Sequence, residues 1–359
     1  MEVKSAAVTS RRKNNWPFAG LVFAVLTLVL FMPKAHAQDK PSLSPIDRTR
    51  LAEVFRLGDQ VSDRIWPNWS EAPFAILLVT PDYEFLIHHP KPSKDFTSLG
   101  YDPVFKSDVL YRKRNFPTHF LATFPAVSGI STIVVGQAEN TSARTSTPWV
   151  VTLLHEHFHQ LQDSQPNFYA DVNALNLSRG DQSGMWMLNY PFPYDRKEIQ
   201  DEFRSVSMAL AAAVQSRGVS RIQQGRRVRQ YLEATWKFRE LISPDDYKYF
   251  AFQLWKEGIA RYTEYQVARL AATTYRPSKE YRALKDFRSF SEVAESLRAG
   301  IFKQLLTQKL GESKREVVYS FGAAEGLLLD KINPRWRARY FVEKFDLSKC
   351  FPSKEEKNL

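Results

Sequence analysis

The stretch that decides the fold and the chemistry runs from residue 147 to residue 162 and reads TPWVVTLLHEHFHQLQ. Thr147 followed by Pro148 is a typical start of a helix, with threonine as the N-cap and proline in the first turn. Apolar residues cover most of the circumference of the helix that follows. We therefore expect this helix to be buried.

Residues 155–159 of this helix form the pattern His-Glu-X-X-His. His155 and His159 lie about one turn apart, so both imidazoles leave the same face and can bind one metal ion. Glu156 lies one position further round, where a general base can take a proton from water beside a metal. His157 is rotated by ~200° from His155. We interpret His157 either as a residue that contacts the metal ligands without binding the metal, or as a structural residue of the core.

A catalytic zinc site takes three protein ligands and leaves a fourth position for water. Because the chain has only one cysteine and seven histidines, we expect the third ligand to be a carboxylate. The best candidate is Glu257, in the segment 255–265 that reads WKEGIARYTEY. Gly258 costs ~1 kcal/mol relative to alanine inside a helix, which close approach of another helix would explain. Glu264, seven residues after Glu257, lies on the same helix face. Without a metal, the two histidines would be a buried core pair and the two glutamates surface residues of a helix.

The His-Glu-X-X-His pattern, followed by Glu-Gly-X-Ala-X-Tyr-X-Glu at 257–264, resembles the gluzincins. This metallopeptidase group includes thermolysin-like enzymes and zinc aminopeptidases. The resemblance covers the zinc-site segments and the helical half of the chain, and is closest to uncharacterised exported bacterial peptidases. It implies that Glu257 is the third zinc ligand and that Tyr319, which begins the segment Tyr-Ser-Phe-Gly, stabilises the oxyanion. We also expect Tyr262 and Glu264 to support the ligands.

Runs of apolar and β-branched residues predict a sheet-rich first half, and helical spacing predicts a helical second half, which together indicate an α+β fold. We expect strands at 74–80, 84–88, 120–124 and 131–135, the first two forming a hairpin. By analogy with gluzincins, 131–135 is expected to be the sheet edge that pairs with an extended substrate. Helices are expected at 148–163, 196–216, 226–241, 244–273, 291–309 and 319–330.

The predicted organisation has four parts. They are a cleaved signal peptide at 1–37, a sheet-rich subdomain at 38–147 that begins with a flexible leader at 38–45, a helical catalytic subdomain at 148–351, and a flexible tail at 352–359. Because 257 − 159 − 1 = 97 residues separate His159 from Glu257, helices at 166–243 are expected to form an insertion.

The N-terminal 37 residues have the order of a secretory signal: basic residues, an apolar run at 18–32, and Ala-His-Ala at 35–37. These residues carry five basic side chains and one acid, a net of +4, so the remaining chain carries 11 − 4 = +7. We expect a periplasmic or secreted bacterial protein. Export argues against a nucleic-acid partner, and no membrane partner is expected after signal cleavage.

These observations predict an exported zinc-dependent hydrolase, with one Zn²⁺ per chain and a peptide or protein as substrate. Glu156 would act as the general base in a metallopeptidase reaction. Two alternatives stay open. One is a noncatalytic zinc-binding interaction protein on a gluzincin-like fold, and the other is a zinc hydrolase of a nonpeptide amide or ester. The sequence makes no prediction of the oligomeric state.

Overall fold

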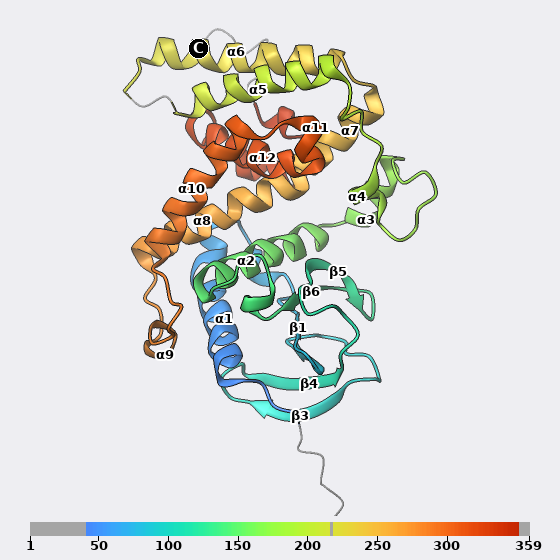
Figure 1. Cartoon of the computed structure of the whole chain (residues 1–359), viewed down its shortest axis with the longest axis vertical. Coiled ribbons are helices and arrows are strands. Elements are labelled where there is room, and N and C mark those ends of the chain that lie inside the picture. The colour runs from blue at the N-terminus through green and yellow to red at the C-terminus, as the bar shows by residue number, and fades with distance from the viewer. Residues whose placement is uncertain (1–40, 216–217, 352–359) are drawn as a thin grey trace, which may run out of the picture. The chain divides into compact units, whose positions relative to one another are not determined.

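A six-stranded mixed sheet organises the first part of the chain in the computed structural model, which describes residues 41–215 and 218–351 (Figure 1). Its order is β3-β4-β2-β1-β6-β5, with β1 and β6 parallel and all other neighbours antiparallel. The predicted α+β class and the β1–β2 hairpin are therefore confirmed. The strands are β1 (Ile76–Val79), β2 (Tyr83–Ile87), β3 (Thr97–Asp102), β4 (Ser107–Lys113), β5 (Leu121–Val127) and β6 (Ile130–Gly136).

The outer strand on the side of β6 is β5, not β6. Strand β6 pairs with β1 on one side and with β5 on the other, so its backbone groups are already used. The expectation that residues 131–135 form the substrate-binding edge is therefore wrong. Strands β3 and β4, at the opposite edge, were not predicted, because their exposed and polar residues give little of the apolar alternation that marks a strand.

Two helices cover one face of the sheet, α1 (Pro45–Ile65) and α2 (Ser146–Asp163). Since successive strand residues point to opposite faces, Ile76 and Leu78 join the main core beneath these helices. Their neighbours Leu77 and Val79 belong to a second, smaller core on the other face. Residues 38–40 of the leader predicted at 38–45 lie outside the described residues, and its last residue, Pro45, begins α1 with the Ser44 hydroxyl as the N-cap.

Helix α2 begins two residues before the predicted start, so the assignment of Thr147 as N-cap is wrong. The N-cap residue is Thr145, and its side chain makes no capping hydrogen bond. The carboxylate of Asp286 instead accepts hydrogen bonds from the backbone N–H and the hydroxyl of Ser146, each at 2.8 Å. The Thr147 hydroxyl donates to the carbonyl of Arg288 at 2.7 Å. A distant loop therefore caps this helix, in place of the local sequence.

The second part of the chain is helical, and α8, α10 and α12 lie side by side at its centre (Figure 1). The helices predicted at 196–216, 226–241, 291–309 and 319–330 correspond to α5, α6, α10 and α12. The α-helices are α3 (Phe168–Ala174), α4 (Trp186–Asn189), α5 (Lys197–Gln215), α6 (Arg221–Glu240), α7 (Pro244–Gln253), α8 (Ile259–Thr274), α9 (Lys279–Arg282), α10 (Phe290–Thr307), α11 (Leu310–Ser313), α12 (Val317–Ile332) and α13 (Trp336–Tyr340).

The described residues include no helix with the length and apolar character that a membrane span requires. The signal peptide predicted at 1–37 and the tail predicted at 352–359 lie outside the described residues.

Candidate metal centre

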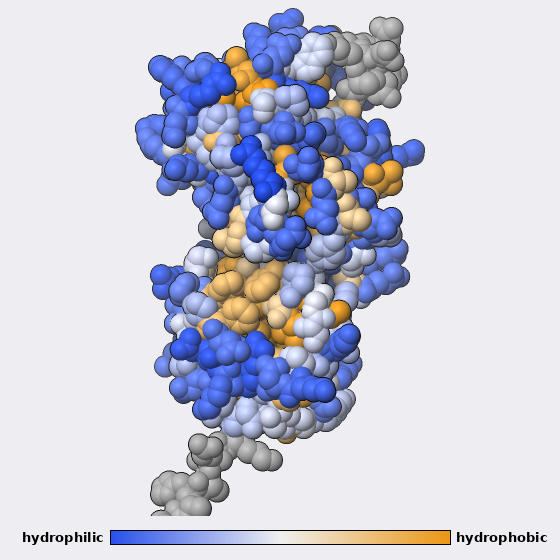
Figure 2. Space-filling view, turned by 90° about the vertical axis from the view of Figure 1, so that its right-hand side faces the viewer, coloured by the Kyte–Doolittle hydropathy of each residue, from blue (hydrophilic) through white to orange (hydrophobic). Residues whose placement is uncertain are grey.

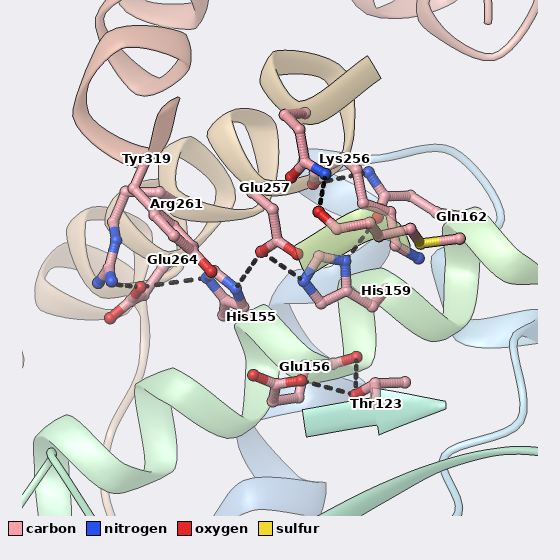
Figure 3. A network of polar contacts seen from close by, with 12 residues as sticks. Thr123, His155, Glu156, His159, Gln162, Lys256, Glu257, Arg261, Glu264 and Tyr319 are labelled. Carbon is pink, nitrogen blue, oxygen red and sulfur yellow. Dashed lines mark hydrogen bonds and ion pairs between the residues drawn. The ribbon is translucent and has the colours of Figure 1, made fainter. Parts of the chain in front are cut away.

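Three predicted ligands, His155, His159 and Glu257, meet where α2 faces the segment before α8 (Figure 3). Their ligand atoms all lie within 4.8 Å of one another. Glu257 Oε2 is 4.0 Å from His155 Nε2 and 3.4 Å from His159 Nε2. Two imidazoles and one carboxylate at this spacing can hold one metal ion, and the set matches the ligand types of catalytic zinc.

The second nitrogen of each imidazole faces an oxygen acceptor. His159 Nδ1 forms a hydrogen bond of 2.7 Å with Gln162 Oε1, whereas His155 Nδ1 lies 3.3 Å from Glu264 Oε2 without the geometry of a hydrogen bond. The acceptor at His159 Nδ1 favours the neutral tautomer that carries its hydrogen there. Both Nε2 atoms lie toward Glu257, and in the Nδ1–H tautomer they would offer their lone pairs to a metal ion.

Glu257 lies in a π-helical turn (Leu254–Gly258), so the single helix predicted at 244–273 is divided into α7, this turn and α8. Gln162 Nε2 donates to the carbonyls of Trp255 and Lys256, each at 3.1 Å. The Tyr340 hydroxyl adds a hydrogen bond of 2.6 Å to the Trp255 carbonyl. A π turn disrupts the regular helical hydrogen-bond pattern and is frequent at functional sites. Gln162 thus fixes both the imidazole of His159 and the turn that carries the third candidate ligand.

The close approach expected at Gly258 is confirmed. A Cβ atom added to Gly258 would lie 2.6 Å from the Cα of Gly322 in α12 and 2.9 Å from the carbonyl oxygen of Val318. Glycine at both positions therefore lets the two backbones touch. The contact sets α12, and with it Tyr319, next to the turn that carries Glu257.

The ring of Tyr319 stacks near His155, with 6.4 Å between the ring centroids. Its hydroxyl accepts a hydrogen bond of 3.1 Å from Arg315, whose guanidinium also lies 3.7 Å from Glu257 Oε1. Burial is the main cause that raises the pKa of Tyr319, and the nearby charge of Glu257 adds to it. Tyr319 is therefore a protonated phenol at neutral pH. The sequence reasoning missed Arg315, although it lies one helical turn before Tyr319.

Opposing effects set the charge of Glu257. Burial acts to raise the pKa of its carboxyl group, but the charge and hydrogen bond of His159 and the charge of Arg315 outweigh it and hold this pKa below its ordinary value. Burial likewise acts to lower the pKa of His159, and the charge of Glu257 overrides it to give a raised pKa. The carboxylate is therefore ionised at neutral pH, as a metal ligand requires.

Glu156 leaves α2 toward the outer strand β5, where its carboxylate accepts a hydrogen bond of 2.7 Å from the Thr123 hydroxyl (Figure 3). Glu156 is buried, with 6% of the residue exposed. Its charge is among those that raise the pKa of His159, so it lies within electrostatic reach of the candidate ligands. Thr123 was not singled out from the sequence, since only the pairing of β5 brings it beside α2.

Glu264 lies where the spacing predicts, with its carboxylate between His155 and Arg261, whose NH1 group donates to it at 2.5 Å. Two other residues expected to support the ligands do not contact them. His157 stacks on Phe74 at 3.7 Å between ring centroids, and burial lowers its pKa to about 3. The Tyr262 hydroxyl donates to Asp330 at 2.7 Å. Both packing arrangements follow from helical rotation, which turns these side chains into the core.

Comparisons with protein-family models, with curated proteins and with solved structures found no match.

Proposed function

We propose that this protein is an exported zinc-dependent hydrolase of gluzincin type that cleaves peptide bonds. The observation that carries the proposal is the convergence of His155, His159 and Glu257 within 4.8 Å, with Glu156 next in the chain to the first histidine. Zn²⁺ bound by these three residues would polarise a water molecule and the substrate carbonyl.

The chain's own residues would move the proton. Glu156 would accept a proton from the attacking water and deliver it to the leaving amine. The Thr123 hydroxyl donates to the Glu156 carboxylate and so orients it. The phenol of Tyr319, held by Arg315, would donate a hydrogen bond to the oxygen that gains negative charge in the transition state.

The outer strand β5 (Leu121–Val127) offers an edge along which an extended peptide substrate could bind. Its only neighbour in the described sheet is β6, so one edge of its backbone is available for strand addition. Since Thr123 of this strand contacts Glu156, a peptide paired along β5 would pass beside the general base.

The test is incubation of the zinc-loaded protein with a complex peptide mixture and mass spectrometry of the products. The proposal predicts new peptide termini that are absent after chelation and return when zinc is restored. Stoichiometric zinc without any new terminus would favour the alternative of a noncatalytic zinc-binding protein. Hydrolysis of esters or nonpeptide amides alone would favour the alternative of a zinc hydrolase with a nonpeptide substrate.

A further inference from the structure

A recess of about 400 Å³ opens between α8, α10, α12 and α13, and none of the candidate metal ligands lines it. Four cationic side chains line this recess against one acid, Asp330. The cations are Arg269, Arg298, Lys331 and Arg337. The formal charge of the wall is therefore 4 − 1 = +3.

The single acid is already fully engaged. Asp330 accepts hydrogen bonds from the Tyr262 hydroxyl at 2.7 Å and the Gln266 amide at 2.9 Å on one oxygen. Its other oxygen accepts from Arg337 at 2.8 Å and from the Trp336 indole at 3.0 Å. A carboxylate has about four acceptor sites, so Asp330 has none left for Arg269 or Arg298.

Two arginines of the recess are held in place by neutral groups. Arg269 donates from Nε to Gln266 Oε1 at 2.9 Å, which leaves the outer nitrogens of its guanidinium for another partner. The guanidinium of Arg298 lies 5.0 Å from the ring centroid of Phe302. Within residues 41–215 and 218–351, neither side chain forms an ion pair with a carboxylate. Both are therefore oriented without being neutralised.

Guanidinium groups bind carboxylate and phosphate oxygens in pairs, through parallel hydrogen bonds. The recess also has the volume of a small-molecule site, for which ~300–1,000 Å³ is typical. We propose that it binds a small polyanion that carries at least two carboxylate or phosphate groups. Arg269 and Arg298 would each bind one of these groups. This proposal is independent of the metal centre.

The test is calorimetric titration of the full chain with citrate and, separately, with inorganic pyrophosphate, at low and at higher salt. We expect saturable binding of one anion per chain that weakens as salt screens the charges. Tighter binding of citrate would indicate a preference for carboxylate groups, and tighter binding of pyrophosphate a preference for phosphate groups. Arg269→Ala combined with Arg298→Ala should weaken binding about tenfold or more, because charge-assisted hydrogen bonds are lost.

A matched control removes two positive charges elsewhere. Lys91→Ala with Lys94→Ala changes two exposed residues of the loop between β2 and β3 and should leave the affinity unchanged. Arg269→Lys with Arg298→Lys keeps the charge but loses the paired donors, so its affinity should lie in between. The proposal is overturned if neither anion binds saturably, or if the variant that lacks Lys91 and Lys94 loses as much affinity as the variant that lacks Arg269 and Arg298.

Discussion

Gly258 and Gly322 touch backbone to backbone, and this contact holds the turn that carries Glu257 against the helix that carries Tyr319. The added Cβ of an alanine at position 258 would lie 2.6 Å from a backbone carbon and 2.9 Å from a backbone oxygen. Backbone atoms cannot swing aside as a flexible side chain can. The two halves of the candidate site therefore depend on two residues that have no side chain.

Gly258→Ala should lower the free energy of unfolding by about 1–3 kcal/mol, because overpacking outweighs the better helix propensity of alanine. It should also weaken zinc binding, since the turn must shift. Urea unfolding and a zinc competition assay measure the two effects. The matched control is Gly300→Ala in α10, where an added Cβ meets nothing within 4 Å. That change should stabilise by about 0.5–1 kcal/mol, and a Gly258→Ala protein as stable as this control would contradict the packing argument.

Glu264→Gln should reduce zinc affinity about 10–100-fold, the usual cost of losing a partner behind a ligating histidine. The substitution keeps the shape but removes the negative charge that faces His155 Nδ1 at 3.3 Å. Chelator competition gives the affinity. Glu233→Gln, at an exposed position of α6, serves as the control and should leave zinc affinity unchanged. Equal affinities in the two variants would mean that Glu264 does not act through His155.

Two glutamines on α2 offer a paired comparison, since each follows a histidine by three residues and contacts its Nδ1. Gln160 contacts His157 at 2.9 Å, and Gln162 contacts His159 at 2.7 Å. Replacement of either by leucine leaves buried partners unpaired and should cost about 1–3 kcal/mol of stability. Only Gln162→Leu should also weaken zinc binding. A similar loss of zinc affinity in Gln160→Leu would show that the effect comes from general destabilisation.

Glu325 predicts a pH dependence of stability that is unrelated to the metal centre. Burial is the main cause that raises the pKa of this carboxyl group from 4.5 to about 8, against a hydrogen bond from Tyr231 that lowers it. The folded protein therefore holds a proton that the unfolded chain releases. The contribution of Glu325 to stability is full below about pH 4.5 and is lost as pH rises toward about 8, with a slope approaching ~1.4 kcal/mol per pH unit.

Glu325→Gln cannot titrate and should flatten that part of the profile. Urea unfolding of both proteins across this pH range measures the difference. Identical slopes for the two proteins would show that Glu325 is ionised in the folded state.

The sequence allowed prediction of the parts of the site that a single helix arranges. His155 and His159 share a face because of the helical period, and Glu257 and Glu264 do so for the same reason. Gly258 was informative because a glycine inside a helix requires a cause. These inferences depend only on residues within a few turns of one another.

The missed features depend on contacts between distant segments. The sequence did not predict helix α1, because charged residues lie among the apolar residues of its buried face and obscure the helical periodicity. Arg50, 2% exposed, pairs with Glu139 at 2.7 Å and with Asp286 at 3.1 Å. Thr123 and Arg315 likewise reach the site through strand pairing and helix packing. For Gln162 a local signal did exist, since it follows His159 by three residues, a spacing that places two side chains together on a helix.

The most direct test of the central claim is the rate of peptide hydrolysis by zinc-loaded Glu156→Gln, with zinc content measured on the same sample. Glutamine keeps the size of the side chain but cannot accept the proton. We predict one zinc per chain, as in the unchanged protein, and a hydrolysis rate lower by about 10²–10⁴-fold. An unchanged rate in the zinc-loaded variant would contradict the assignment of Glu156 as general base and, with it, the proposed hydrolase.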